Sequence, residues 1–140
     1  MTQRLFTIIP VVAVLVLLAP SLLGPDADTR VFEMRTYTTS EGNLDLLHKR
    51  FRDHTNARFE KHGMELVGYW TPTDGETANN TLVYILAYPS REARDASWTA
   101  FGEDPEWQAA YQASHEEAGG RIVSNVESVF LQPTDYSPIK

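Results

Sequence analysis

The hydrophobic pattern after residue 30 changes several times along the chain between the period of a strand and the period of a helix. Runs rich in β-branched and aromatic residues indicate strands, and apolar residues that recur every three or four positions indicate helices. The pattern predicts a strand at 31–38, a helix at 44–62, strands at 64–72 and 81–88, helical segments at 91–101 and 105–118, and a strand at 121–133. This βαββαβ order is that of the α+β, ferredoxin-like fold, a four-stranded antiparallel sheet with helices on one face.

Residues suited to helix ends support these boundaries. Asn43 and Ser90 stand where an N-cap is needed, and Asp104 followed by Pro105 is typical of a new helix start. Gly63 stands just after the first helix, where a C-terminal glycine is favoured. The sequence leaves open whether the last two helical segments form one bent helix or two.

The sheet face that the helices leave uncovered is also predicted to be apolar. The strand at 81–88, TLVYILAY, is apolar on both faces, and the strands at 64–72 and 121–133 place large apolar residues on both faces. Soluble monomers rarely leave such a broad apolar surface in water. We therefore expect a homodimer with sheet packed on sheet, a dimeric α/β barrel that encloses a cavity.

The strand at 31–38 carries charges on one of its faces. One set of alternate residues consists of Phe32, Met34 and Thr36. The other consists of Val31, Glu33, Arg35 and Tyr37. The first set is expected to face the helices, and the second to line the cavity of the dimer or its mouth. A charge there must be paired. Glu33 and Arg35 can either pair with each other or recognise a ligand, and we favour the ion pair.

Other residues are further candidates for the cavity. His54 and Arg58 are four apart on the first helix and so lie on one side of it. His54 could act as a base or hydrogen-bond donor beside the polar groups of the first strand or Trp70. The alternative is a boundary histidine satisfied by backbone or a carboxylate. Strand parity also makes Tyr84 a candidate.

Composition removes several classes of function. The formal net charge is −7 and the basic residues are scattered, which argues against nucleic acid and anionic lipid as main partners. There is no cysteine, so disulfides and thiolate sites are excluded. The histidines lack the spacing of a metal motif, and no glycine-rich nucleotide loop is present. We expect neither a metal nor a cofactor.

The first 29 residues differ from the rest of the chain. Arg4 precedes an almost wholly apolar run at 5–23, which is typical of an export signal. The run is also long enough to remain as a membrane anchor. We therefore expect residues 1–29 to be a signal peptide or anchor with a short linker, residues 30–140 to form one domain, and the product to be periplasmic, extracellular or membrane-anchored.

The domain resembles the NIPSNAP family. The resemblance runs from residue 30 to the C-terminus and rests on VFEMRTYT, on FRDHTNARFEKHGMELVGYWTP, on NTLVYILAYPSREARDASWTAFGEDPEWQAAY and on VESVFLQPTDYSPI in combination. It implies the dimeric α/β-barrel fold, in agreement with the dimer expected from the apolar faces. It implies no settled catalytic activity.

Three functional hypotheses follow. The first is an exported homodimer that binds or interacts, with itself as partner and a small apolar or aromatic ligand in its cavity. The second, suggested by the wider superfamily, is a cofactor-free oxygenase or isomerase that uses the cavity, with His54, Arg35 and Tyr37 as working groups. The third is a structural dimerisation module on a membrane anchor.

Overall fold

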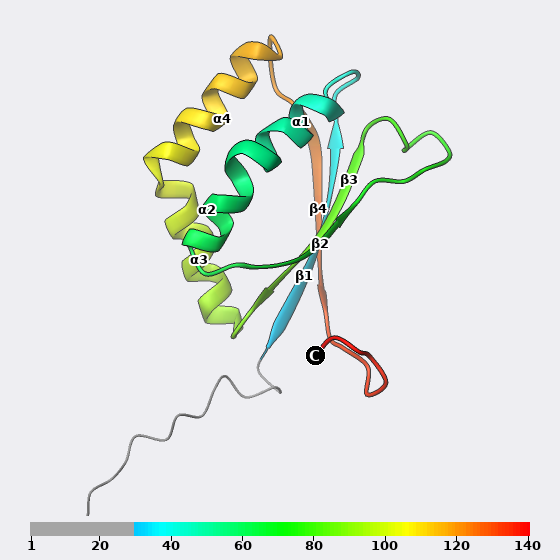
Figure 1. The fold of residues 1–140 in the computed structure, drawn as a ribbon, viewed down its shortest axis with the longest axis vertical. Helices are drawn as coiled ribbons and strands as arrows, with labels where there is room; N and C mark the ends of the chain where they lie inside the picture. Colours follow the sequence, from blue (N-terminus) through cyan, green and yellow to red (C-terminus); the bar gives the residue numbers. More distant parts are fainter. Residues whose placement is uncertain (1–29) are drawn as a thin grey trace, which may run out of the picture.

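The computed structural model describes residues 30–140, so the predicted export segment lies outside the described residues. The elements are β1 (Val31–Thr39), α1 (Leu44–Arg50), the π-helical segment η1 (Phe51–Thr55), α2 (Asn56–Lys61), β2 (Glu65–Trp70), β3 (Thr81–Tyr88), α3 (Arg91–Glu103), α4 (Pro105–Glu117) and β4 (Val123–Leu131). The helices gather on one side of a twisted sheet (Figure 1). Within residues 30–140, no helix has the length and apolar character needed to cross a bilayer.

The sheet has the strand order β2-β3-β1-β4, and every neighbouring pair is antiparallel. Strands β1 and β3 occupy the centre, where both edges of each strand are paired. In β1, residue Arg35 pairs with Tyr84 of β3 on one side and with Ser128 of β4 on the other. The α+β, ferredoxin-like fold predicted from the βαββαβ order is therefore confirmed.

The first helix contains a π-helical turn that the sequence pattern did not reveal. Between α1 and α2, the backbone N–H of Asn56 donates to the carbonyl of Phe51, five residues back, and Thr55 Oγ1 donates to the carbonyl of Arg50 at 3.2 Å. A π turn holds one more residue than an α turn, so side chains before and after it do not keep the ordinary helical spacing. Such turns occur often at functional sites.

The last two helical segments are separate helices that meet at Asp104. Its backbone is extended, and its side chain accepts hydrogen bonds from the backbone N–H groups of Glu106 and Trp107. Pro105 begins α4, as predicted. At the start of α3, Ser90 Oγ accepts from the backbone N–H of Ala93, whereas the expected N-cap Asn43 makes no side-chain capping bond.

The core between the sheet and the helices is largely aromatic. Phe59 of α2 lies at its centre, with ring centroids 4.8 Å from Phe101 and 5.4 Å from Trp98. Phe51 packs edge-on against Tyr84, with centroids 5.2 Å apart. Aromatic pairs at these separations add to the free energy gained by burial.

The predicted assignment of the two faces of β1 is wrong. Glu33 and Arg35 contact α3, and the ring of Tyr37 packs against Phe51 of η1, so this set faces the helices. The other set therefore lies on the sheet face opposite the helices, which we call the open face. Both sets include large apolar or aromatic groups, and hydrophobic alternation alone could not distinguish them.

The open face is apolar, as the sequence predicted. By strand alternation and register its apolar residues are Phe32, Met34, Trp70, Val83, Ile85, Val129 and Leu131, and Thr36, Thr38, Asn125 and Glu127 make one end of it polar. Phe32 is buried, but Trp70 and Val129 are 53% and 50% exposed. No helix of residues 30–140 covers this face (Figure 1).

Candidate functional site

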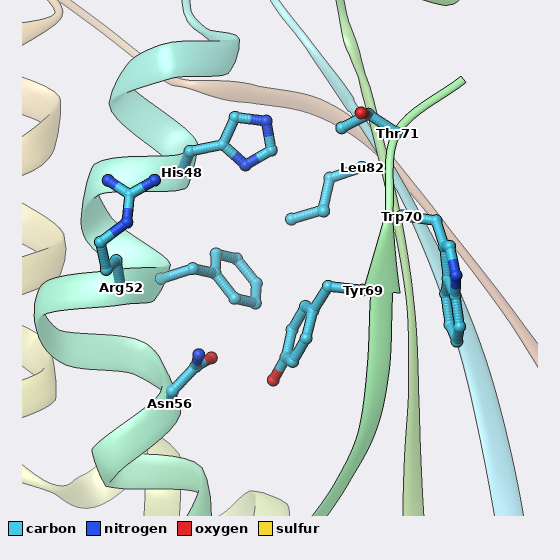
Figure 2. A pocket seen from close by; sticks show the side chains of 8 residues that line it. His48, Arg52, Asn56, Tyr69, Trp70, Thr71 and Leu82 are labelled. Carbon is cyan, nitrogen blue, oxygen red and sulfur yellow. The ribbon is translucent and has the colours of Figure 1, made fainter. Parts of the chain in front are cut away.

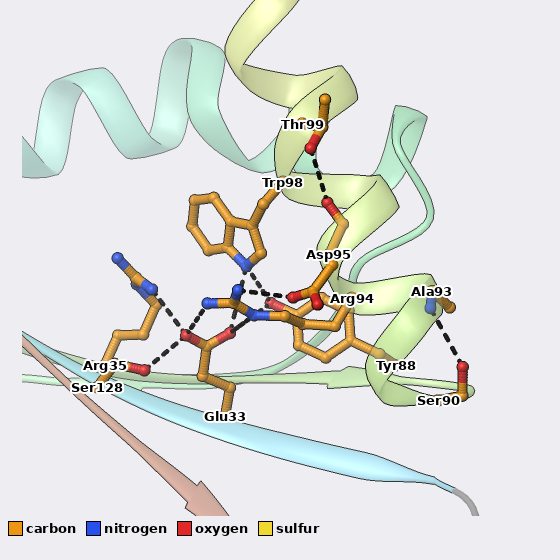
Figure 3. Close-up of polar contacts among 10 residues, drawn as sticks. All are labelled: Glu33, Arg35, Tyr88, Ser90, Ala93, Arg94, Asp95, Trp98, Thr99 and Ser128. Atoms are coloured by element: carbon orange, nitrogen blue, oxygen red, sulfur yellow. Dashed lines mark hydrogen bonds and ion pairs between the residues drawn. The ribbon is translucent and has the colours of Figure 1, made fainter.

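The Glu33 carboxylate is the centre of a buried polar cluster between the sheet and α3 (Figure 3). Arg35 Nη1 and Arg94 Nη2 both donate to its Oε1 at 2.7 Å, and Ser128 Oγ donates to the same atom at 2.6 Å. Its Oε2 accepts from Arg94 Nε at 2.9 Å, from Tyr88 OH at 3.1 Å and from Trp98 Nε1 at 3.2 Å.

These partners leave Glu33 no free acceptor site for a ligand. Burial alone would raise the pKa of the Glu33 carboxyl, but hydrogen bonds from Arg94, Ser128 and Arg35 outweigh it and hold the pKa at about 2. Glu33 and Arg35 do form an ion pair, but Arg94 completes it and it lies inside the protomer. The cluster therefore fixes α3 to the sheet.

A second polar cluster joins the end of α2 to the start of α4. Asp104 Oδ2 accepts from Lys61 Nζ at 2.8 Å and lies 2.7 Å from His62 Nε2, while Oδ1 caps α4. The hydrogen bond from Lys61, followed by that from His62, lowers the pKa of Asp104 to about 2. The carboxylate therefore holds two helices together.

We expect acid to destabilise the fold as Glu33 and Asp104 take up protons. Both folded pKa values, about 2, lie below the ordinary values of 4.5 and 3.8. Their stabilisation is therefore present above those ordinary values and is lost as the pH falls from about 4.5 towards 2. Urea unfolding at a series of pH values should show this decline, and Glu33→Gln or Asp104→Asn should flatten it. A free energy of unfolding that stays constant over this interval would contradict the assignment.

A cavity of about 140 Å³ lies between the sheet and the helices, and we call it the inner chamber. It is lined by Tyr37, Arg50, Phe51, Thr55, Phe59, Phe101, Trp107, Tyr111, His115, Arg121, Val123 and Val126. Half of these side chains are aromatic rings of phenylalanine, tyrosine or tryptophan. The exposed members Tyr111, Arg121 and Val126 mark its mouth between α4 and β4, and the buried phenylalanines form its floor.

Arg50 is the buried cation of the inner chamber. The residue is only 4% exposed, and its guanidinium lies 5.2 Å from the ring of Tyr111 and 5.4 Å from that of Trp107. Its Nη1 donates to Ser114 Oγ at 3.2 Å, whereas its Nε has no hydrogen-bond partner in residues 30–140. No ion pair of these residues includes Arg50.

The charged side chains that line the inner chamber are all positive. Burial lowers the pKa of Arg50 because the cation is removed from water. Burial, and then the nearby charges of Arg50 and Arg121, also lower the pKa of His115. His115 lies against Tyr111, with ring centroids 4.1 Å apart. None of the lining residues is acidic, so nothing in the wall neutralises these cations.

A second, more open cavity of about 320 Å³ lies at the β2 edge of the sheet, and we call it the edge pocket. Figure 2 shows His48 and Asn56 reaching into it from the first helix and Tyr69 from β2, while the side chain of Arg52 runs along the helix. The Oδ1 atom of Asn56 and the hydroxyl of Tyr69 are buried and have no partner in the described residues. Burial raises the pKa of Tyr69.

The structure separates the site residues that were predicted from the sequence. Tyr37 lines the inner chamber, and the ring of Tyr84 packs on it with centroids 5.2 Å apart. Arg35 stacks over Tyr37 at 5.6 Å and over Trp98 at 4.3 Å. These residues and Glu33 therefore share the helix-facing side of the sheet, not the cavity of a dimer.

The remaining predicted site residues lie elsewhere. His54 is exposed in a shallow groove against α4, away from Arg35, Tyr37 and Trp70, so the predicted cooperation with them is wrong. Arg58 forms an ion pair with Glu106 of α4. Trp70 lies on the open face, and Figure 2 shows its ring on the opposite side of β2 from Tyr69. Within residues 30–140, no three His, Asp or Glu side chains lie together as a metal site would require.

Sequence reasoning missed Arg50, Tyr111, His115 and Arg121. One signal was available, because Arg50 stands three residues after Leu47 and one before Phe51, inside the apolar stripe of the first helix. A charge in such a stripe is either paired or functional. The three residues from α4 and the loop after it carried no comparable signal.

Solved structures share this fold. An uncharacterised NIPSNAP domain protein from Burkholderia xenovorans is 28% identical, with a TM-score of 0.64, 77% of this chain covered and 98% of that one. A NIPSNAP family protein of unknown function from Agrobacterium tumefaciens is 24% identical, with a TM-score of 0.68, 80% of this chain covered and 95% of that one.

A more distant structural match is SnoaB from Streptomyces nogalater, a cofactor-independent oxygenase. It is 14% identical, with a TM-score of 0.51, 79% of this chain covered and 98% of that one, and it supports the fold alone. No curated protein matches this chain significantly. The NIPSNAP family model matches residues 32–138, nearly the whole described domain. The chain therefore belongs to the NIPSNAP family, as its sequence motifs indicated.

Proposed function

We propose that this NIPSNAP domain is a homodimeric binding protein that takes a small, largely aromatic molecule into the inner chamber of each protomer. The observation that carries the proposal is the chamber itself, an aromatic-walled cavity with a mouth to solvent and polar groups at a few positions. Ligand sites are typically such concave, mainly apolar spaces with a small number of polar groups. Native mass spectrometry of freshly purified full-length protein should show a retained small molecule or uptake of an added one-ring aromatic compound.

Binding is favoured over the enzymatic alternative by the position of His54. That alternative assigned the proton transfer to His54 beside Arg35 and Tyr37, and the exposed position of His54 removes it from them. The likeness to a cofactor-independent oxygenase concerns the fold, and fold alone does not assign a reaction. Failure of native mass spectrometry and of titration to detect any one-ring aromatic ligand would contradict the binding function.

The homodimer part of the proposal rests on the open face. Val129 and Trp70 expose about half of their surface there, beside Met34, Val83 and Ile85 of the central strands. A second copy offers the same apolar face, and a two-fold axis brings the two faces together in a self-complementary contact.

Val129→Lys is expected to dissociate the dimer. The substitution places an unpaired charge from each copy within the proposed contact, and uncompensated burial of a charge costs about 3–5 kcal/mol, so the dimer should weaken by at least roughly 100-fold. Sedimentation velocity at micromolar concentration should give a dimer for the wild type and a monomer for the variant. Ala100→Lys, on the exposed surface of α3, is the matched control and should remain dimeric. A monomeric wild type would overturn the dimer.

Export is also part of the proposal and rests on the apolar run at 5–23 after Arg4. We propose a periplasmic or extracellular product whose leader is removed, and residues 5–23 would anchor it in the membrane if they were retained. Mass spectrometry of the protein recovered from the producing cells distinguishes the two forms. An intact Met1 terminus would exclude cleavage.

A further inference from the structure

Arg50 carries a buried positive charge that the described domain does not fully compensate. A guanidinium removed from water needs an anion or a full set of hydrogen-bond acceptors, because transfer of an unpaired charge into a protein interior is strongly unfavourable. Arg50 is 4% exposed, has one hydrogen bond to a neutral hydroxyl and has an unpartnered Nε. The aromatic faces of Trp107 and Tyr111 compensate the charge only in part.

Neighbouring acidic residues are already engaged. Glu117, in the groove on the outer side of Arg50, pairs with Lys49 at 3.0 Å. Glu33 is enclosed by Arg35 and Arg94. The inner chamber, which Arg50 lines, has no acidic residue in its wall. An anion for Arg50 must therefore come from outside the described domain.

The size of the inner chamber and the side chains of its wall indicate what the remainder of the anionic ligand would be. A cavity of about 150 Å³ lined by apolar side chains binds benzene, and the chamber, at about 140 Å³, has space for a body of this size. The rings of Phe51, Phe59, Phe101 and Trp107 offer edge and face contacts to a planar guest. The planar guanidinium edge that carries Nε matches a carboxylate in shape and charge.

We propose that the inner chamber binds a monocyclic aromatic carboxylate, whose carboxylate pairs with Arg50 and whose ring packs among the aromatic side chains of the wall. The inference rests on the proposed binding function and specifies its ligand class. The ring enters through the mouth at Tyr111, Arg121 and Val126, and Arg121 provides a positive charge on the way. His115 lies beside the carboxylate and can gain a proton as the anion binds, because an adjacent negative charge favours the imidazolium.

The test uses benzoate as the probe and the full-length protein as the receptor. Isothermal titration with benzoate, benzamide and benzyl alcohol compares one anionic ring with two neutral rings of similar size. Benzoate should bind roughly 10- to 100-fold more tightly than either neutral compound, as expected for hydrogen bonds to a charged group. Arg50→Met, which keeps the apolar stem, should lose this difference, while Arg52→Met, an exposed arginine in the edge pocket, should keep it.

A second readout does not depend on whether Arg50→Met folds. In the wild type, benzoate should raise the pKa of His115 in an NMR titration, and benzamide should leave it unchanged. Equal binding of benzoate and benzamide would overturn the inference while leaving the binding function intact. Loss of benzoate binding in Arg52→Met instead of Arg50→Met would also overturn it, because the edge pocket would then be the site. If none of benzoate, benzamide and benzyl alcohol binds, both the inference and the proposed binding function are overturned.

Discussion

Replacement of Glu33 with glutamine should lower the free energy of unfolding by about 3–5 kcal/mol, the range found when one partner of a buried ion pair is removed. The glutamine has nearly the same shape, so packing is preserved. Its amide, however, carries no negative charge for Arg35 and Arg94 and turns two donor hydrogens towards groups that are themselves donors. The two arginines would remain partly buried without an anion.

Urea denaturation followed by circular dichroism measures this loss. Glu116→Gln is the matched control, because Glu116 is exposed on α4 and should change the free energy of unfolding by no more than about 0.5 kcal/mol. In the double variant Glu33→Gln with Arg94→Met, part of the loss should be recovered, because one uncompensated charge is gone. A loss below about 1 kcal/mol in the single variant would show that water satisfies the arginines and that the cluster does not hold α3.

Local signals in the sequence predicted the fold well. The composition of TLVYILAY places β3 at its observed bounds, and Asp104 followed by Pro105 marks the boundary between α3 and α4. These signals act over a few residues, through side-chain shape and hydrogen bonds to the neighbouring backbone. The strand order then follows from the sequence of elements, because few topologies connect a βαββαβ chain without crossing.

The face of β1 could not be predicted in the same way. Its orientation depends on Arg94, which is 61 residues from Glu33 and supplies the charge that makes a carboxylate acceptable beneath a helix. Without that partner, placement of Phe32 and Met34 under the helices is the lower-energy choice from hydrophobicity alone. The distant charge of Arg94 therefore places Glu33 under the helices, although local hydrophobicity favoured Phe32 and Met34 there.

The position of His54 could not be predicted from the sequence for a different reason. A regular helix of 44–62 would have kept one apolar stripe, with His54 at its edge. The π turn at η1 adds a residue within that stretch, so the spacing after Phe51 no longer follows the regular pattern. His54 lies within the turn and is exposed to solvent, not at the edge of the stripe. Hydrophobic periodicity assumes a regular helix and cannot detect this change.

Phe59→Ala should lower the free energy of unfolding by about 3–5 kcal/mol, as is typical when a buried phenylalanine is truncated. Phe59 is 1% exposed and contacts the rings of Phe51, Trp98 and Phe101. Its removal leaves a cavity that these neighbours can fill only in part. Because Phe59 also forms part of the wall of the inner chamber, the new space should join the chamber and enlarge it.

This enlargement distinguishes the chamber from an ordinary core cavity. Indole, a two-ring compound, should raise the thermal unfolding temperature of Phe59→Ala more than that of the wild type, because a ligand that binds only the folded state stabilises it by mass action. Tyr136→Ala, at a site 84% exposed, is the control, and it should change the free energy of unfolding by no more than about 0.5 kcal/mol and gain no response to indole. The contrary result is a Phe59→Ala variant that is destabilised but no more responsive to indole than the wild type. In that case the neighbouring side chains have filled the new space or the chamber is closed to solvent. Phe59 would then be an ordinary core residue that does not determine the size of the ligand site.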